Sequence, residues 1–346
     1  MLILSVCNSY YWTKTVPYNF KGTYNFIKVP VPEGGIEFPI GLDDEDTARI
    51  ENAFYIAETL VTRALWDTVA RWATEKKLAP YRDVFSYNHH EDDNGLKRTD
   101  NKVGVYGDLP IGIDTDLIYS NYKLGKNDWG LKVIPQWCNA FTEWYNEKYG
   151  TNYIPVYQDM YGNPINSPVG SQEINLLDSI NTNVNGFRLP STIEWELAAR
   201  WNGSSSVNTV TATINSIDFS AQPIKFTTGR SASGAKNDVT NLGENNRVAI
   251  WENNSNTFYK KVLPSSITSY PAPIKSKESN MLGIYDMSGN AMEHTGTYTP
   301  RSVNSGGYQS KGGSYFSNYE DIAIGKLFEH DSSMNHFCFR LARNAE

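Results

Sequence analysis

Residues 186–203, GFRLPSTIEWELAARWNG, predict a short helix with a clear start and one buried face. Ser191 is a good N-cap residue, and Glu194 three residues later completes a capping box, in which each side chain accepts a hydrogen bond from the other residue's backbone N–H. Trp195 and Ala199 are four residues apart, so they share one helix face and can pack inward. We therefore expect a helix after Ser191 that is anchored in the core by Trp195.

Two segments before this one also have helical periodicity. In FYIAETLVTRALWDTV, residues 54–69, a strand-like start is followed by apolar residues at helical spacing after Thr62, which is a good N-cap. In VIPQWCNAFTEW, residues 133–144, and the residues directly after it, aromatic side chains repeat at helical spacing until Gly150. Both segments are therefore expected to form core-facing helices.

The rest of the chain indicates short strands and loops. Residues 1–50 alternate apolar and turn-forming residues, which is typical of short strands separated by Pro and Gly. After Gly203 the sequence is almost free of helix signals and rich in Ser, Asn, Thr and Gly. Three blocks stand out there, LGIYDMSGNAMEHT at 282–295, KGGSYFSN at 311–318 and FRLAR at 339–343. The Ser-Gly-Asn of the first block predicts a turn, because Gly allows a positive φ.

Composition and charge exclude several functional classes. The 346 residues include 31 basic and 38 acidic side chains, a formal charge of -7, and no basic stripe that could neutralise a phosphate backbone. Nucleic acid is therefore not an expected partner. No segment reaches the roughly 18 apolar residues of a membrane span. Cys7, Cys138 and Cys338 are odd in number and lack the spacing of a zinc site, so neither a disulfide framework nor structural zinc is indicated.

These blocks, in this order, resemble the formylglycine-generating-enzyme (sulfatase-modifying factor) family. The resemblance implies an α+β, C-type-lectin-like fold with a few helices, short antiparallel strands and much ordered loop. We expect one such domain over residues 1–346, with N-terminal strands in 1–50.

The resemblance also implies where a catalytic site would lie. The family's enzymes oxidise a cysteine of a sulfatase with a copper-binding cysteine pair that follows the GGSY-type block, and these positions fall at Ser317 and Ile322 here. A cuprous ion needs thiolate ligands, which neither side chain provides. Cys338, close by in the sequence, is more typical of a small buried residue than of a nucleophile. We therefore expect a protein that is not an enzyme and requires no cofactor.

Calcium is a separate case, because members of the family often bind it through an Asn and backbone oxygens ahead of a G-N-x-x-E block. Asn280 and Glu293 match these positions, and oxygen ligands suit calcium. Met292 and His294, however, replace the Trp residues that usually flank the Glu. Two interpretations stay open, a calcium site at Asn280 and Glu293, or a Glu293 that accepts hydrogen bonds from backbone N–H groups.

A subset of the family resembles the variable proteins of diversity-generating retroelements, whose residues between the GGSW-type and GFR-type blocks are rewritten by adenine-directed mutagenesis. The corresponding segment here is 315–338, within a C-terminal variable segment that we place at 305–346. Many of its residues can arise from an AAC codon by changes at the adenines, and aromatic residues alternate with polar ones, as in adaptable binding surfaces. The predicted ligand-binding residues are Tyr315, Phe316, Ser317, Asn318, Tyr319, Asp321, Ile324, Lys326, Phe328, His330, Ser333, Asn335 and His336.

The sequence thus predicts a receptor- or adhesin-type protein that binds a protein or glycan ligand on a cell or phage surface. Its expected location, which follows from this function, is extracellular, on a cell surface or on a virion. Two alternatives stay open. One is a divergent metal-dependent oxidase of the formylglycine-generating or sulfoxide-synthase type, which would need Cys138, Cys338 or the His89-His90 pair as ligands. The other is a structural surface or virion component.

Overall fold

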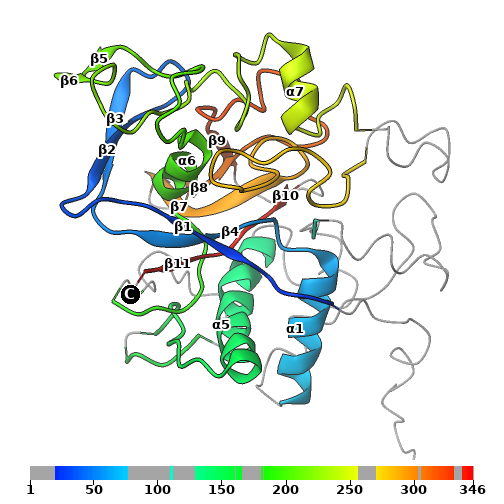
Figure 1. The fold of residues 1–346 in the computed structure, drawn as a ribbon. Helices are drawn as coiled ribbons and strands as arrows, with labels where there is room; N and C mark the ends of the chain where they lie inside the picture. The colour runs from blue at the N-terminus through cyan, green and yellow to red at the C-terminus, as the bar shows by residue number, and fades with distance from the viewer. Residues whose placement is uncertain are drawn as a thin grey trace, which may run out of the picture.

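The computed structural model describes residues 20–76, 110–111, 129–159, 161–165, 181, 183–255, 270–302, 305–330 and 337–345. Within these ranges the chain has a mixed α+β fold with long stretches of irregular backbone, as the sequence predicts (Figure 1). The helices in these ranges are α1 (Arg63–Glu75), α5 (Trp129–Tyr149), α6 (Thr192–Arg200) and α7 (Leu242–Val248). Among the described residues, no helix has the length and apolar character of a membrane span.

The strands form two larger sheets and two hairpins. The antiparallel sheet β1-β4-β11 consists of β1 (Phe26–Val29), β4 (Phe54–Ala57) and β11 (Ala342–Asn344). The sheet β10-β7-β8-β9 consists of β7 (Met292–Ser302), β8 (Ser305–Lys311), β9 (Phe328–His330) and β10 (Phe337–Cys338), of which β10 is parallel to β7. The hairpins pair β2 (Ile36–Ile40) with β3 (Asp46–Ile50), and β5 (Thr213–Ile214) with β6 (Ile217–Asp218). Strands β1 to β3 confirm the prediction for residues 20–50, whereas residues 1–19 lie outside the described ranges.

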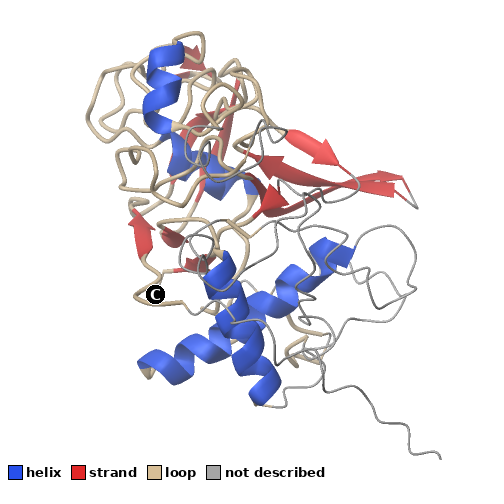
Figure 2. Ribbon diagram, turned by 90° about the vertical axis from the view of Figure 1, so that its right-hand side faces the viewer, coloured by secondary structure: helices blue, strands red, loops and turns tan. Residues whose placement is uncertain are grey.

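The β1-β4-β11 sheet lies between two hydrophobic cores. On one side α1 and α5 pack together, and the rings of Trp66 and Trp137 stack with their centroids 5.2 Å apart. On the other side α6 buries Trp195 completely in the core that also contains Phe54 and Ile56 of β4. Figure 2 shows the same division, with the two long helices at one end and the loop-rich part at the other. The long loops that follow β8 therefore belong to the half of the molecule that contains α6 and α7.

The predicted helix starts are confirmed. The Thr62 side chain accepts a hydrogen bond from Leu65 N at the start of α1. Ser191 Oγ accepts from Glu194 N at 3.2 Å and the Glu194 carboxylate accepts from Ser191 N at 2.8 Å, which completes the capping box of α6. Helix α5 ends directly before Gly150, as predicted.

Helix α7 corrects the expectation that the chain is almost helix-free after Gly203. Asn241 caps this helix through a hydrogen bond from Glu244 N to its side chain. The helix buries only Asn245 and Val248, so its short sequence, LGENNRV, has no apolar periodicity that could reveal it.

Candidate functional site

Hydrogen bonds of the backbone fix the path of the segment that follows β8, residues 312–327. Ser314 and Ser317 bond to each other twice, since Ser317 N donates to Ser314 O at 3.0 Å and Ser314 N donates to Ser317 Oγ at 2.9 Å. Farther along, Gly325 N donates to Gly229 O at 2.9 Å. Because these contacts use backbone atoms and one buried hydroxyl, they fix the path of the segment without using its exposed side chains.

The turn beneath the segment supplies further anchors. Asn290 O accepts a hydrogen bond from Tyr315 N at 3.1 Å, and Ser288 Oγ donates to Ile322 O at 2.8 Å. Between them Gly289 has a φ of +71°, and a Cβ at this position would lie 2.1 Å from the backbone oxygen of Ile250. Only Gly therefore fits here. This confirms the turn predicted from the Ser-Gly-Asn sequence.

A buried charge network holds β8 in place just before the segment. Lys311 Nζ lies 2.8 Å from one oxygen of Glu196, and Arg200 Nη2 lies 2.8 Å from the other. Gly41 N also donates to Glu196, at 2.8 Å. Burial alone would raise the pKa of Glu196, but its attraction to Lys311 and Arg200 outweighs burial and holds the pKa below the usual range. The charged carboxylate therefore ties α6, β8 and the loop after β2 together.

Three of the predicted ligand-binding residues are buried, which corrects the surface expected from the sequence. Tyr315 and Ser317 are each 9% exposed, and Ile324 is fully buried in the core that surrounds Trp195. Tyr315 packs on Ile250 in a small separate cluster. These three side chains support the segment from below and do not face solvent.

The other described members of the predicted set are exposed or partly exposed. Phe316 is 57% and Tyr319 is 36% exposed, which is unusual for large apolar rings. Asn318 is exposed as well, and its side-chain oxygen accepts hydrogen bonds from the backbone N–H groups of Glu320 and Asp321. We call the following residues the exposed set, of which the first three are exposed and the last four are partly exposed: Phe316, Asn318, Tyr319, Asp321, Lys326, Phe328 and His330. The predicted Ser333, Asn335 and His336 lie outside the described residues.

A loop that the sequence did not single out lies beside the exposed set. Glu252 N donates a hydrogen bond to Ser317 O at 3.1 Å, and Glu252 and Asn253 are both exposed. The contact joins residues that are far apart in the sequence, and no motif around residue 252 indicates it.

Asn280 and Glu293, the two predicted calcium ligands, have other partners. The Glu293 carboxylate lies 2.6 and 2.7 Å from Nε and Nη2 of Arg340, and both side chains are buried. The Asn280 side-chain oxygen accepts hydrogen bonds from the backbone N–H groups of Leu282 and Ile284. The Glu293 carboxylate is already paired with a guanidinium, and the Asn280 oxygen already accepts two hydrogen bonds. Neither group therefore fits the role of a calcium ligand. The alternative interpretation also needs correction, because the partner of Glu293 is Arg340 and not a set of backbone N–H groups.

The residues at the family's copper positions do not fit that metal. The Ser317 hydroxyl accepts the hydrogen bond from Ser314 N, and Ile322 is a fully buried hydrocarbon side chain. Cys138 and Cys338 are also fully buried, and burial raises the pKa of both thiols. A protonated thiol that is shielded from water is a poor nucleophile and a poor metal ligand.

Asp286, in the turn that supports the segment, carries an unusual carboxyl group. It is 4% exposed, and it accepts hydrogen bonds from Lys275 N at 3.0 Å and from the Asn290 amide at 3.3 Å. Burial nevertheless raises its pKa to about 6. A carboxyl whose pKa is higher in the folded chain binds more protons when folded, so the contribution of Asp286 to the free energy of unfolding rises as the pH falls through 6.

Between pH 7 and pH 5 we expect the free energy of unfolding of the wild type to change by about 1 kcal/mol more in favour of the folded state than that of Asp286→Asn. Asn tolerates the positive φ of this position, +57°. The measurement is urea unfolding of both proteins at both pH values. All other titratable groups are common to the two proteins, so their contributions cancel in the comparison. An equal gain in the two proteins would contradict the raised pKa.

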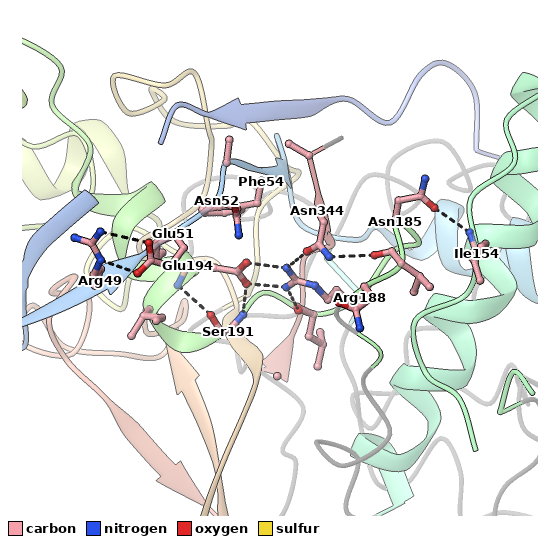
Figure 3. Close-up of a pocket in the computed structure, with 18 residues that line it drawn as sticks. Arg49, Glu51, Asn52, Phe54, Ile154, Asn185, Arg188, Ser191, Glu194 and Asn344 are labelled. Atoms are coloured by element: carbon pink, nitrogen blue, oxygen red, sulfur yellow. Dashed lines mark hydrogen bonds and ion pairs between the residues drawn. The ribbon is translucent and has the colours of Figure 1, made fainter. Parts of the chain in front are cut away.

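A groove of about 800 Å³ lies away from the exposed set, where the end of β3, residues 183–191 and the start of α6 meet (Figure 3). Its central feature is Arg188, whose two terminal nitrogens each lie 2.7 Å from a Glu194 oxygen. One of them also donates to the Asn344 side chain, at 2.7 Å. These contacts join the capping box of α6 to β11. None of the predicted ligand-binding residues lines this groove, and its charged centre has a structural role, so we place the candidate site at the exposed set.

The fold and the site together define a C-type-lectin-like scaffold of the formylglycine-generating-enzyme type that carries an exposed, irregular C-terminal surface. Residues 28–345 match the model of the sulfatase-modifying factor enzyme 1-like domain, so the chain belongs to this family.

Two solved structures are similar to the chain in fold. The crystal structure of CarF is 18% identical, with a TM-score of 0.57 over 94% of this chain and 99% of CarF. Treponema denticola variable protein 1 is 19% identical, with a TM-score of 0.56 over 93% of this chain and 95% of that protein. No curated protein sequence matches the chain. At these identities the likeness shows the fold alone.

Proposed function

We propose that the protein is a non-enzymatic binding protein whose exposed set contacts a protein or glycan ligand. The observation that carries this proposal is the exposure of Phe316 and Tyr319 on a segment whose backbone is held by buried groups. In protein interfaces, exposed aromatic side chains that are surrounded by polar ones often contribute most of the binding energy. A rigid segment also loses little conformational entropy when the ligand binds.

We further propose that the exposed set is diversified, as in the variable proteins of diversity-generating retroelements. The separation of roles supports this, because Ser317 and Tyr315 support the loop while Phe316 and Tyr319 face outward. A change of an outward side chain leaves the supporting contacts intact. The shared fold with a protein described as a variable protein is in keeping with the proposal. A diversified receptor acts outside the cell or on a virion, which is the location that we propose.

The divergent oxidase is the less favoured function. It would require Cys138 or Cys338 as a reactive thiol, and both are buried with a raised pKa. The His89-His90 pair, its other source of ligands, lies outside the described residues.

The DNA downstream of the gene provides the test of diversification. We expect a near-copy of the codons for residues 305–346 beside a reverse-transcriptase gene, with mismatches confined to adenines of the copy. The mismatches should fall on codons of the exposed set and spare those of Ile322, Ile324 and Gly325, which are buried. Without such a copy, the diversification proposal fails and a static receptor or a structural component becomes the better account.

A further inference from the structure

Two adjoining loops place carboxylates around the exposed aromatic rings. The described loop 250–255 carries Glu252, and the loop 314–321 carries Glu320 and Asp321, while neither contains Lys or Arg. Lys326 Nζ lies 3.6 Å from Asp321 and offsets that charge. Glu252 and Glu320 have no ion-pair partner among the described residues, and both are exposed.

The hydrogen bond from Glu252 N to Ser317 O fixes the two loops against each other. Ser317 lies directly between Phe316 and Asn318 in the chain, so Glu252 is held next to the exposed set. Asn253, the next residue, is exposed and adds an amide that can both donate and accept hydrogen bonds.

We propose, on the basis of the binding function above, that Glu252 and Asn253 belong to the ligand-binding surface and that the partner is a protein segment rich in Arg and Lys. The face of an aromatic ring attracts a guanidinium or ammonium group. A guanidinium can stack on Phe316 or Tyr319 while its N–H groups donate to a carboxylate. A neutral sugar can also pack on an aromatic ring and donate hydroxyl hydrogen bonds to a carboxylate, but it carries no positive charge to offset Glu252 and Glu320, and an acidic glycan would be repelled by them. The unpaired charges of Glu252 and Glu320 thus favour a cationic protein over a glycan.

The test uses the full chain and a phage library of random dodecapeptides. Peptides are selected in parallel on the wild type and on the double variant Phe316→Ser/Tyr319→Ser, which serves as the background. We expect the peptides specific to the wild type to be enriched in Arg and Lys. Their binding should weaken about tenfold in Glu252→Gln/Glu320→Gln and at raised salt concentration. The matched control is Glu33→Gln, which neutralises an exposed carboxylate in the loop before β2 and should leave binding unchanged.

The outcomes separate the two proposals. Two results would overturn the cationic partner and leave the binding function intact. In the first, the peptides specific to the wild type are not enriched in Arg and Lys. In the second, basic peptides bind Glu252→Gln/Glu320→Gln as tightly as the wild type. If the wild type enriches no peptide above the double variant, the binding of protein segments by the exposed set is itself overturned.

Discussion

Replacing Glu293 with Gln is expected to lower the free energy of unfolding by about 3 to 5 kcal/mol, because it leaves the Arg340 guanidinium buried without a counter-charge. Both side chains of this pair are inaccessible to water, and the two oxygens of Glu293 lie 2.6 and 2.7 Å from Arg340. Arg340, which lies between β10 and β11, also donates to Ala57 O and Tyr285 O, so the pair joins this part of the chain to β7 and to the end of β4. The Gln side chain keeps the volume of Glu, so the change is restricted to the lost charge and to one of the two hydrogen bonds from Arg340. Guanidinium unfolding measures the loss.

Glu51→Ala is the matched control, because Glu51 forms an equally short ion pair with Arg49 at the surface. Exposed ion pairs contribute little to stability, so we expect the free energy of unfolding to change by less than about 1 kcal/mol.

Calcium depletion of the wild type distinguishes the two accounts of Glu293. If its partner is Arg340, a chelator leaves the unfolding midpoint unchanged. A fall of the midpoint comparable to that of Glu293→Gln would instead support a calcium site.

Gly325→Ala is expected to cost about 3 kcal/mol, because a methyl group at this position has no room. A Cβ on Gly325 would lie 2.2 Å from Gly41 O and 2.6 Å from the Cα of Leu42, both backbone atoms that cannot rotate away. The backbone bond from Gly325 N to Gly229 O would be displaced together with the segment. Thermal unfolding should report the loss as a lower midpoint.

The control for this variant is Gly296→Ala, where a Cβ would meet Leu189 at an ordinary 3.5 Å. We expect a change of less than about 1 kcal/mol there. Equal midpoints for the two variants would show that the segment does not lie against Gly41 as described.

Local sequence patterns predicted the helices that carry the scaffold. Thr62 and the pair Ser191 and Glu194 identified helix starts, because a cap is formed by residues close together in the chain. Helix α7 was missed because its LGENNRV sequence has no apolar stripe. The blocks around residues 282–295 and 311–318 led to the family, which the match over residues 28–345 confirms.

The sequence pointed to the segment that carries the candidate site, but not to the direction of its side chains. Within residues 315–325 the direction of each side chain is set by long-range backbone contacts, such as those of Tyr315 with Asn290 and of Gly325 with Gly229. Such a segment has neither the period of a strand nor that of a helix, so no sequence pattern could separate exposed Phe316 from buried Ser317. For the same reason Glu293 could be assigned to calcium, because Arg340 reaches it only through the fold.

The central claim is that the outward residues of this segment can change without loss of the fold, and two small libraries in the full chain test it most directly. One replaces Phe316 and Tyr319, and the other replaces Tyr315 and Ser317, each with Asn, Asp, His and Ile. We predict that variants of the first library unfold within about 2 °C of the wild type, whereas those of the second unfold roughly 5 °C lower or more. Equal losses in the two libraries would contradict the separation of a supporting from a ligand-facing set.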